Sequence, residues 1–185
     1  MTRYNGIYML ILLTSISQFL ISQDNVPKEL LILATIEKRD SFLVAINDAD
    51  QTARHNSNDI CGRNYGTLDC LQSKIDCKQI DANNLKKIAA YIRLYGYPDH
   101  NTYSSKAYDT PWLVLHHTVG AANKIDKEFA PYLVQEYRNG WLKVLNLHWY
   151  LKRYYLSYMG MQYTRTTSKS EEEDIEELIK VLKIF

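Results

Sequence analysis

The sequence predicts an all-α fold, a single-domain irregular bundle of about six helices that follows an N-terminal signal segment. Apolar residues recur at three- to four-residue steps along most of the chain, which is the period of an amphipathic helix. Glycine and proline are scarce, with 7 and 4 among 185 residues, and this disfavours a β-sandwich with many turns. A hydrophobic fraction of 46% argues for a folded domain with a core rather than for disorder.

The N-terminus predicts export. Arg3 precedes an apolar run from Ile7 to Ile21 that carries no charge and is shorter than the ~20 residues that usually span a membrane. This is typical of a secretory signal peptide. We therefore expect residues 1–23 to be a signal peptide, residues 24–185 to form one helical domain, and the protein to be secreted or periplasmic. Cleavage near Ser15 and Ser17, cleavage at Ser22–Gln23 and an uncleaved membrane anchor remain alternatives.

The charge balance limits the partners. Removal of residues 1–23 takes away one basic residue and leaves 21 basic and 21 acidic residues without a strongly basic block. Nucleic-acid binding is not expected, because contacts with phosphates need clustered lysine and arginine. We expect a small polar ligand or an envelope protein as partner, and membrane contact only through an uncleaved N-terminal segment.

In the first half of the chain, a helical pattern opens at Pro27. It either continues through residues 47–55 or breaks near Asp40–Ser41. Residues 56–66 are rich in asparagine and glycine and predict a loop. A short helix is then expected from Leu68 to Ile75. The next helix would begin with Asp81 as its N-cap and end at Gly96.

In the second half, Thr110 and Pro111 have the residue types of an N-cap and a first helical position. Two further helices are expected over residues 124–138 and 141–159, the second ended by Gly160. Ser170 and Glu173 have the spacing of a capping box, which opens the last helix.

Three cysteines follow the first helical pattern. Cys70 and Cys77 are seven residues apart in an expected helix, about 10 Å along its axis, which is too far for a disulfide. An oxidising compartment therefore predicts that any bridge includes Cys61. Three buried thiols are the alternative.

Asp50 and Arg54 are four residues apart, so they share a helix face, with Gln51 beside them. The pair is either a surface ion pair of little energetic consequence or an acid–arginine pair that faces a pocket.

The stretch Trp112–Gly120 contains the adjacent histidines His116 and His117. Neighbouring helical side chains diverge by about 100°, so the two cannot both face one ligand. A helix-end or core histidine is the ordinary interpretation of such a residue. No further ligands occur at the short spacing that zinc sites use, so neither a metal site nor a cofactor is predicted.

Six short motifs occur in one order within residues 30–167. They are DQTAR (from Asp50), DANNL (from Asp81), GYP (from Gly96), HH (His116–His117), KR (Lys152–Arg153) and QYTRT (from Gln162). Their order and spacing resemble an uncharacterised family of bacterial helical proteins with the motifs D-Q-x-x-R, D-x-x-N-L, G-W-P, Q-H, D-R and Q-x-Y-G-T.

This chain departs from that family at three places. His116 replaces a glutamine, Lys152 replaces an aspartate, and the Y-G-T element is Thr164-Arg165-Thr166. The resemblance implies that the polar motif residues meet in space, namely Asp50, Arg54, His117, Arg153 and Gln162. It implies no known reaction, and the departures suggest an altered or lost site. We interpret Asp81 mainly as a helix cap.

Two main functions follow. The first is an extracytoplasmic helical module that binds a small polar ligand or an envelope protein, with Gln51, Arg54, Arg153 and Gln162 as ligand-binding residues. The second is a hydrolase or transferase in which His117 is the general acid or base and Asp50 orients it, while Arg54 or Arg153 binds an anionic group. A concave pocket with His117 in hydrogen-bond reach of a carboxylate would favour the enzyme. A third possibility is an immunity or inhibitor protein that presents a surface.

Overall fold

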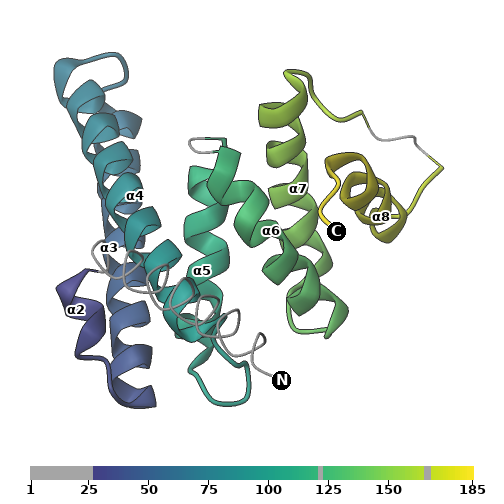
Figure 1. The fold of residues 1–185 in the computed structure, drawn as a ribbon. Coiled ribbons are helices and arrows are strands. Elements are labelled where there is room, and N and C mark those ends of the chain that lie inside the picture. The colour runs from purple at the N-terminus through teal and green to yellow at the C-terminus, as the bar shows by residue number, and fades with distance from the viewer. Residues whose placement is uncertain (1–26, 121–122, 165–167) are drawn as a thin grey trace, which may run out of the picture. The chain divides into compact units, whose positions relative to one another are not determined.

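The computed structural model describes residues 27–120, 123–164 and 168–185, and these residues form seven helices and no strand (Figure 1). The all-α prediction is confirmed. Contacts divide the chain into a unit of residues 1–34, which contains the short α2 (Lys28–Leu31), and a unit of residues 35–185. The predicted signal peptide, with its boundary at residue 23, lies outside the described residues. Within the described residues, no helix is long and apolar enough to cross a membrane.

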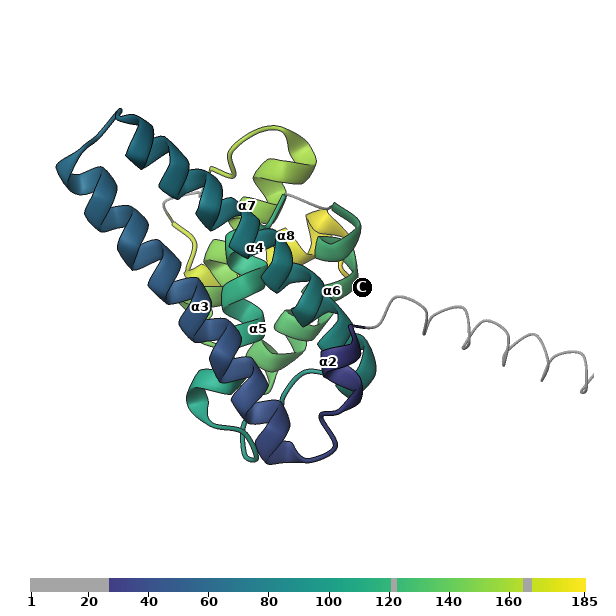
Figure 2. The ribbon, with the colours of Figure 1, turned by 90° about the vertical axis from the view of Figure 1, so that its left-hand side faces the viewer.

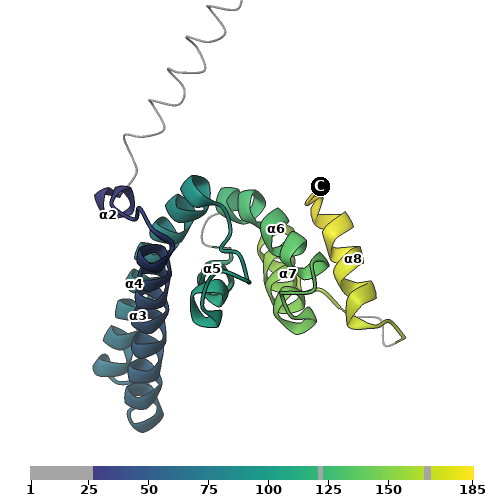
Figure 3. The same ribbon diagram turned by 90° about the horizontal axis from the view of Figure 1, so that it is seen from below.

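The unit of residues 35–185 is built as a series of helices, in which α5 packs on the two helices before it and on α7. Its elements are α3 (Ile36–Arg63), α4 (Leu68–Tyr95), α5 (Ser105–Thr118), α6 (Asn123–Arg138), α7 (Val144–Met159) and α8 (Glu171–Leu182). Helices α3 and α4 form a long hairpin, and α5 packs against both of them (Figure 2). Helix α7 contacts α5, α6 and α8, so the order along the unit runs from the hairpin through α5 to α8 (Figure 3).

Helix α3 begins later and ends later than the sequence indicates, and the pattern that opens at Pro27 forms the separate short helix α2. It begins after Thr35, whose side chain accepts a hydrogen bond from the Lys38 N–H, and runs without a break to Arg63. The alternative of a break near Asp40–Ser41 is therefore wrong, and the loop predicted over residues 56–66 is correct only for residues 64–66. The polar residues of this segment favour loops locally, but in the hairpin they meet polar residues of α4. The Ser57 and Ser73 hydroxyls, for example, are buried and 3.1 Å apart.

Helix α4 is one helix, where the sequence suggested two. It starts after the Thr67 cap and ends at Gly96, whose φ of +78° is open to glycine at little cost. Asp81 therefore lies in the helix interior, and its interpretation as an N-cap is wrong. The apolar residues expected to pack the short first helix, Leu68, Leu71 and Ile75, are instead 82%, 51% and 56% exposed.

Helix α5 also begins earlier than expected. Ser104 is its N-cap, and the prediction of Thr110 and Pro111 as cap and first position is wrong. The Ser104 N–H and hydroxyl donate to the Asp40 carboxylate of α3 at 2.6 and 3.1 Å, which anchors the start of α5 to the hairpin. Thr110 is fully buried inside the helix, with its hydroxyl 2.7 Å from the Lys106 carbonyl oxygen.

Beyond α5, the helices and helix ends predicted from local sequence agree more closely with the structure. The expected helices over residues 124–138 and 141–159 correspond to α6 and α7. Helix α7 ends at Gly160 in the left-handed region, and both hydrogen bonds of the Ser170–Glu173 capping box are present at the start of α8. Each of these helix ends depends on hydrogen bonds between groups within about one helical turn, so contacts with distant residues do not change it.

The disulfide joins Cys61 to Cys70, and Cys77 is a free thiol that is partly buried. The expectation that Cys61 forms the bridge is confirmed, and the alternative of three thiols is wrong. The bond ties the end of α3 to the start of α4 at the tip of the hairpin.

Candidate functional site

The site centres on Asp50, a carboxylate of α3 that is only 2% exposed. It accepts hydrogen bonds from Gln51 Nε2 at 2.8 Å and from Arg54 Nε and Nη2 at 3.2 and 3.3 Å. His117 Nδ1, from α5, lies 3.2 Å from it. Burial by itself would raise the pKa of Asp50, but the hydrogen bonds and positive charges of His117 and Arg54 outweigh it and hold the pKa below its usual value. Asp50 is therefore an anion at neutral pH.

Arg54 connects three helices. From α3 its Nη2 donates to Asp81 of α4 at 2.5 Å, and its Nε lies 2.8 Å from His117 Nδ1 of α5. The side chain keeps 30% exposure. Its Nη1 group makes no hydrogen bond within the described parts of the chain. The guanidinium is thus fixed by two carboxylates while one of its donor groups is available to a ligand.

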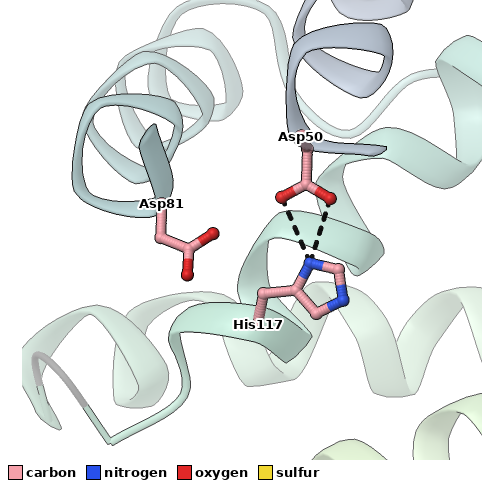
Figure 4. A group of neighbouring side chains, drawn as sticks. All are labelled: Asp50, Asp81 and His117. Carbon is pink, nitrogen blue, oxygen red and sulfur yellow. Dashed lines mark hydrogen bonds and ion pairs between the residues drawn. The ribbon is translucent and has the colours of Figure 1, made fainter. Parts of the chain in front are cut away.

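The Nδ1 nitrogen of His117 has two competing partners. It can accept the Nε–H of Arg54 only when it carries no proton, and it can donate to Asp50 only when it does. In the first case the proton of a neutral ring lies on Nε2, and in the second Nε2 carries the lone pair. Figure 4 shows the ring edge-on to the carboxylate of Asp50, with Nε2 turned away from it. The contacts of Nδ1 therefore decide whether Nε2 is a donor or a base.

Asp81 is the member of the cluster that the sequence interpretation missed. Burial raises its pKa, and the negative charge of Asp50 adds to this, while Arg54, His117 and Arg153 act in the opposite direction. The pKa of Asp81 is thus raised, whereas that of Asp50 is lowered. Asp81 is the first residue of the DANNL motif, so the motif order could have placed it in the site. The interpretation of Asp81 as a helix cap leaves it out.

Asp50, Asp81 and His117 could in principle hold a metal ion, because one ligand atom from each lies within 4.8 Å of the others (Figure 4). The same atoms already contact Arg54, which bonds to both carboxylates and lies against Nδ1. A divalent cation would have to displace this guanidinium. The donor set therefore suits the chain's own cation better than a metal, and the prediction of no metal stays a prediction.

Two hollows adjoin the cluster. One, of about 520 Å³, is lined by His117, Asp81 and the apolar residues Leu85, Val119 and Ile125, among others. The other, of about 460 Å³, lies along α3 and α4 and includes Arg54 in its wall. Asp81 and Lys78 line both hollows. His117 and Arg54 therefore each line a hollow, and the two hollows share Lys78 and Asp81.

His116 points to a different neighbour, as the helix geometry predicts. Its ring stacks on Trp112 with centroids 5.2 Å apart, and its Nε2 lies 3.3 Å from Arg153 Nη1 of α7. Burial lowers the pKa of His116 to about 4, and the charge of Arg153 adds to this. His116 is thus a neutral ring at neutral pH and leaves the acid–base candidate as His117.

The structure brings most of the expected residues together. Asp50, Arg54 and His117 are in direct contact, and Gln51 joins them through Asp50. Arg153 lies next to this group. It contacts His116, and its positive charge favours the ionised form of Asp81. Gln162 is exposed after α7, and no hydrogen bond joins it to the cluster in the described residues.

Comparisons with known proteins found no matching family model, no similar curated protein and no similar solved structure. The resemblance to a bacterial helical family stays a prediction, and inferences about function depend on the geometry of the cluster.

Proposed function

We propose that the protein is an enzyme of hydrolase or transferase type in which His117 is the general acid–base. One observation carries this proposal: His117 Nδ1 lies 3.2 Å from the buried Asp50 carboxylate, and His117 forms part of the wall of a hollow of about 520 Å³. This meets the geometric condition that favours an enzyme over a binding module.

The roles follow from the atoms. When Nδ1 donates to Asp50, Nε2 carries a lone pair and makes no hydrogen bond within the described residues. Nε2 can then take a proton from a water molecule or a substrate hydroxyl as its oxygen attacks the electrophilic centre of the substrate. The histidine then returns the proton to the leaving group. Asp50 orients the ring and stabilises the imidazolium that forms, because it remains ionised. Arg54 offers its Nη1 group to an anionic part of the substrate.

The test uses chromogenic para-nitrophenyl substrates: an acetate, a phosphate monoester, a phosphate diester and a glycoside. We expect turnover of at least one of them, with kcat/KM about 100-fold lower in His117→Gln, the size typical of general acid–base catalysis. Asp50→Asn should lower it by a similar or smaller factor. His55→Gln is the matched control, because His55 lies one helical turn from Gln51 on α3 and its side chain is 77% exposed.

Circular dichroism must show that each variant is folded. Turnover that survives in His117→Gln contradicts the proposal, and so does an absence of turnover over the whole set of substrates.

A second function, binding of a small polar ligand without chemistry, is favoured by one observation. Arg54 Nε lies nearer to His117 Nδ1 than Asp50 does, at 2.8 against 3.2 Å. In that arrangement the neutral ring carries its proton on Nε2 and acts as a donor rather than as a base. Nitrogen-15 shifts of the His117 ring distinguish the two tautomers: a proton on Nδ1 at neutral pH supports the enzyme, and a proton on Nε2 supports the binding module.

We also propose that the protein works outside the cytoplasm, as a secreted or periplasmic protein. The Cys61–Cys70 disulfide supports this, because such bonds persist in oxidising compartments. Expression of the full chain, followed by fractionation and by mass measurement of the exported product, tests both export and the cleavage position. Retention of the full-length chain in the reducing cytoplasm would contradict the proposal.

A further inference from the structure

The hollow along the α3–α4 hairpin has an unbalanced charge. Seven residues line it: Arg54, Ser57, Asn58, Lys74, Cys77, Lys78 and Asp81. Three of them are cations and one is an acid, and the acid is already bonded to the arginine. The cations come from two helices, with Arg54 on α3 and both lysines on α4. The hollow thus offers positive charge from two sides.

The three cations keep hydrogen-bond donors that are available to a ligand. Arg54 keeps its Nη1 group available, as described above. Lys74 lies over the Tyr65 ring at 5.2 Å, a contact that an exposed lysine can exchange for a ligand. Within the described segments, no ion pair is found for Lys78. Neutral hydrogen-bonding groups, Ser57 and Asn58, stand beside Arg54 on α3.

We propose that this hollow binds the phosphate group of a small phosphorylated substrate, through Arg54, Lys74 and Lys78. The proposal rests on the proposed function and names the substrate class for the same site. The Nη1 group of Arg54 can donate to a phosphate oxygen while Nε and Nη2 stay bonded within the cluster, and the lysines serve as point charges around the phosphate. Arg54 also contacts His117, with Nε 2.8 Å from Nδ1, so a phosphate bound to Arg54 would lie on a neighbour of the histidine.

The location of the hollow also matters. Lys78 and Asp81 line both this hollow and the one that contains His117, so a molecule could extend from one to the other. The second hollow has a largely apolar lining, including Leu85, Val119 and Ile125, which suits the non-ionic part of a substrate. The expected substrate is therefore a phosphomonoester or diester with an apolar organic group.

The experiment is isothermal titration of the full chain with pyrophosphate and, separately, with succinate, at one fixed ionic strength because salt screens such contacts. We expect saturable binding of pyrophosphate that weakens at least tenfold in Lys74→Gln/Lys78→Gln. The matched control is Lys124→Gln/Lys127→Gln, which removes the same charge from two exposed lysines of α6 outside both hollows. The control should bind within twofold of the unaltered protein.

Three results would overturn the assignment: no saturable binding of pyrophosphate, equal weakening in the control, or equally tight binding of succinate. His117→Gln separates this proposal from the proposed function, because it should retain pyrophosphate binding while it loses turnover. Turnover that depends on His117, combined with no pyrophosphate binding, would refute the phosphate hollow alone. Binding without turnover would refute the enzyme alone.

Discussion

Among the described residues, two histidine–aspartate pairs join one helix to another, and their surroundings differ. His117 and Asp50 join α5 to α3 at 3.2 Å, and the His117 side chain keeps 16% exposure. His148 and Asp174 join α7 to α8 at 3.6 Å, and their side chains are 5% and 0% exposed. The first pair borders a hollow and includes an arginine. In the second, Asp174 instead accepts a hydrogen bond from the Tyr163 hydroxyl at 3.0 Å.

The comparison shows that residue type does not define a site. A general base needs both an orienting carboxylate and access to substrate. Of these two pairs, His117–Asp50 combines both features, because the second pair is enclosed by packing between α7 and α8. We therefore interpret His148–Asp174 as a structural pair that holds α8 in place, and His117–Asp50 as the functional one.

The largest expected effect is on stability. His148→Ala should lower the free energy of unfolding by about 3 kcal/mol, because it leaves a cavity and a buried carboxylate without its imidazole. Urea denaturation followed by circular dichroism measures this change. His117→Ala should cost about 1 kcal/mol or less in the same assay. Similar losses in the two variants would remove the distinction between the pairs.

A second prediction concerns a buried carboxylate, Asp126, for which no ion pair is found among the residues that the structure describes. Asp126 is 2% exposed, like Asp50, but its carboxylate accepts from the Gly120 backbone N–H at 2.9 Å. Burial raises the pKa of Asp126 to about 6, from an ordinary 3.8, whereas that of Asp50 is lowered. The raised pKa means that the folded protein binds the proton more tightly than the unfolded chain does. The ionised Asp126 therefore destabilises the fold at pH 7, and this penalty disappears as the pH falls towards 4.

Asp126→Asn should therefore be more stable than the unaltered protein above pH 7, by about 2 kcal/mol, with the difference gone near pH 4. Asp50→Asn should behave in the opposite sense: it removes a contribution that is present above pH 4 and lost as the pH falls through the lowered pKa. Urea midpoints of the three proteins from pH 2 to 8 give the two slopes, because the change at Asp50 falls below pH 4 and the change at Asp126 above it. Parallel curves would show that Arg54 and His117 do not determine the charge state of Asp50.

The smallest expected effect is the stability change of His117→Gln, below about 1 kcal/mol, because the ring is partly exposed and glutamine can still donate to Asp50. Thermal denaturation against His55→Gln measures it. A loss above 2 kcal/mol would indicate that His117 is a structural residue like His148, and would weaken the functional comparison.

Much of the site could be predicted. Asp50 and Arg54 are four residues apart on one helix, so their contact follows from local geometry, and Gln51 lies beside them. The approach of His117 was expected only from the order of the motifs, because 63 residues separate it from Arg54. Asp81 was assigned to a helix end, because an aspartate that precedes a helical pattern is a common N-cap. Its partner Arg54 lies 27 residues away and could not be inferred from the local sequence.

The sequence alone determined the helical class, the helix ends at Gly96 and Gly160 and the capping box at Ser170, because each depends on spacing or on groups within one turn. Only the tertiary structure decided that α3 and α4 run unbroken, since the polar segments that favour loops find partners across the hairpin. It also decided which of two similar histidine–aspartate pairs has access to a cavity. That access depends on how neighbouring helices enclose each pair, which the local sequence around the two histidines does not specify.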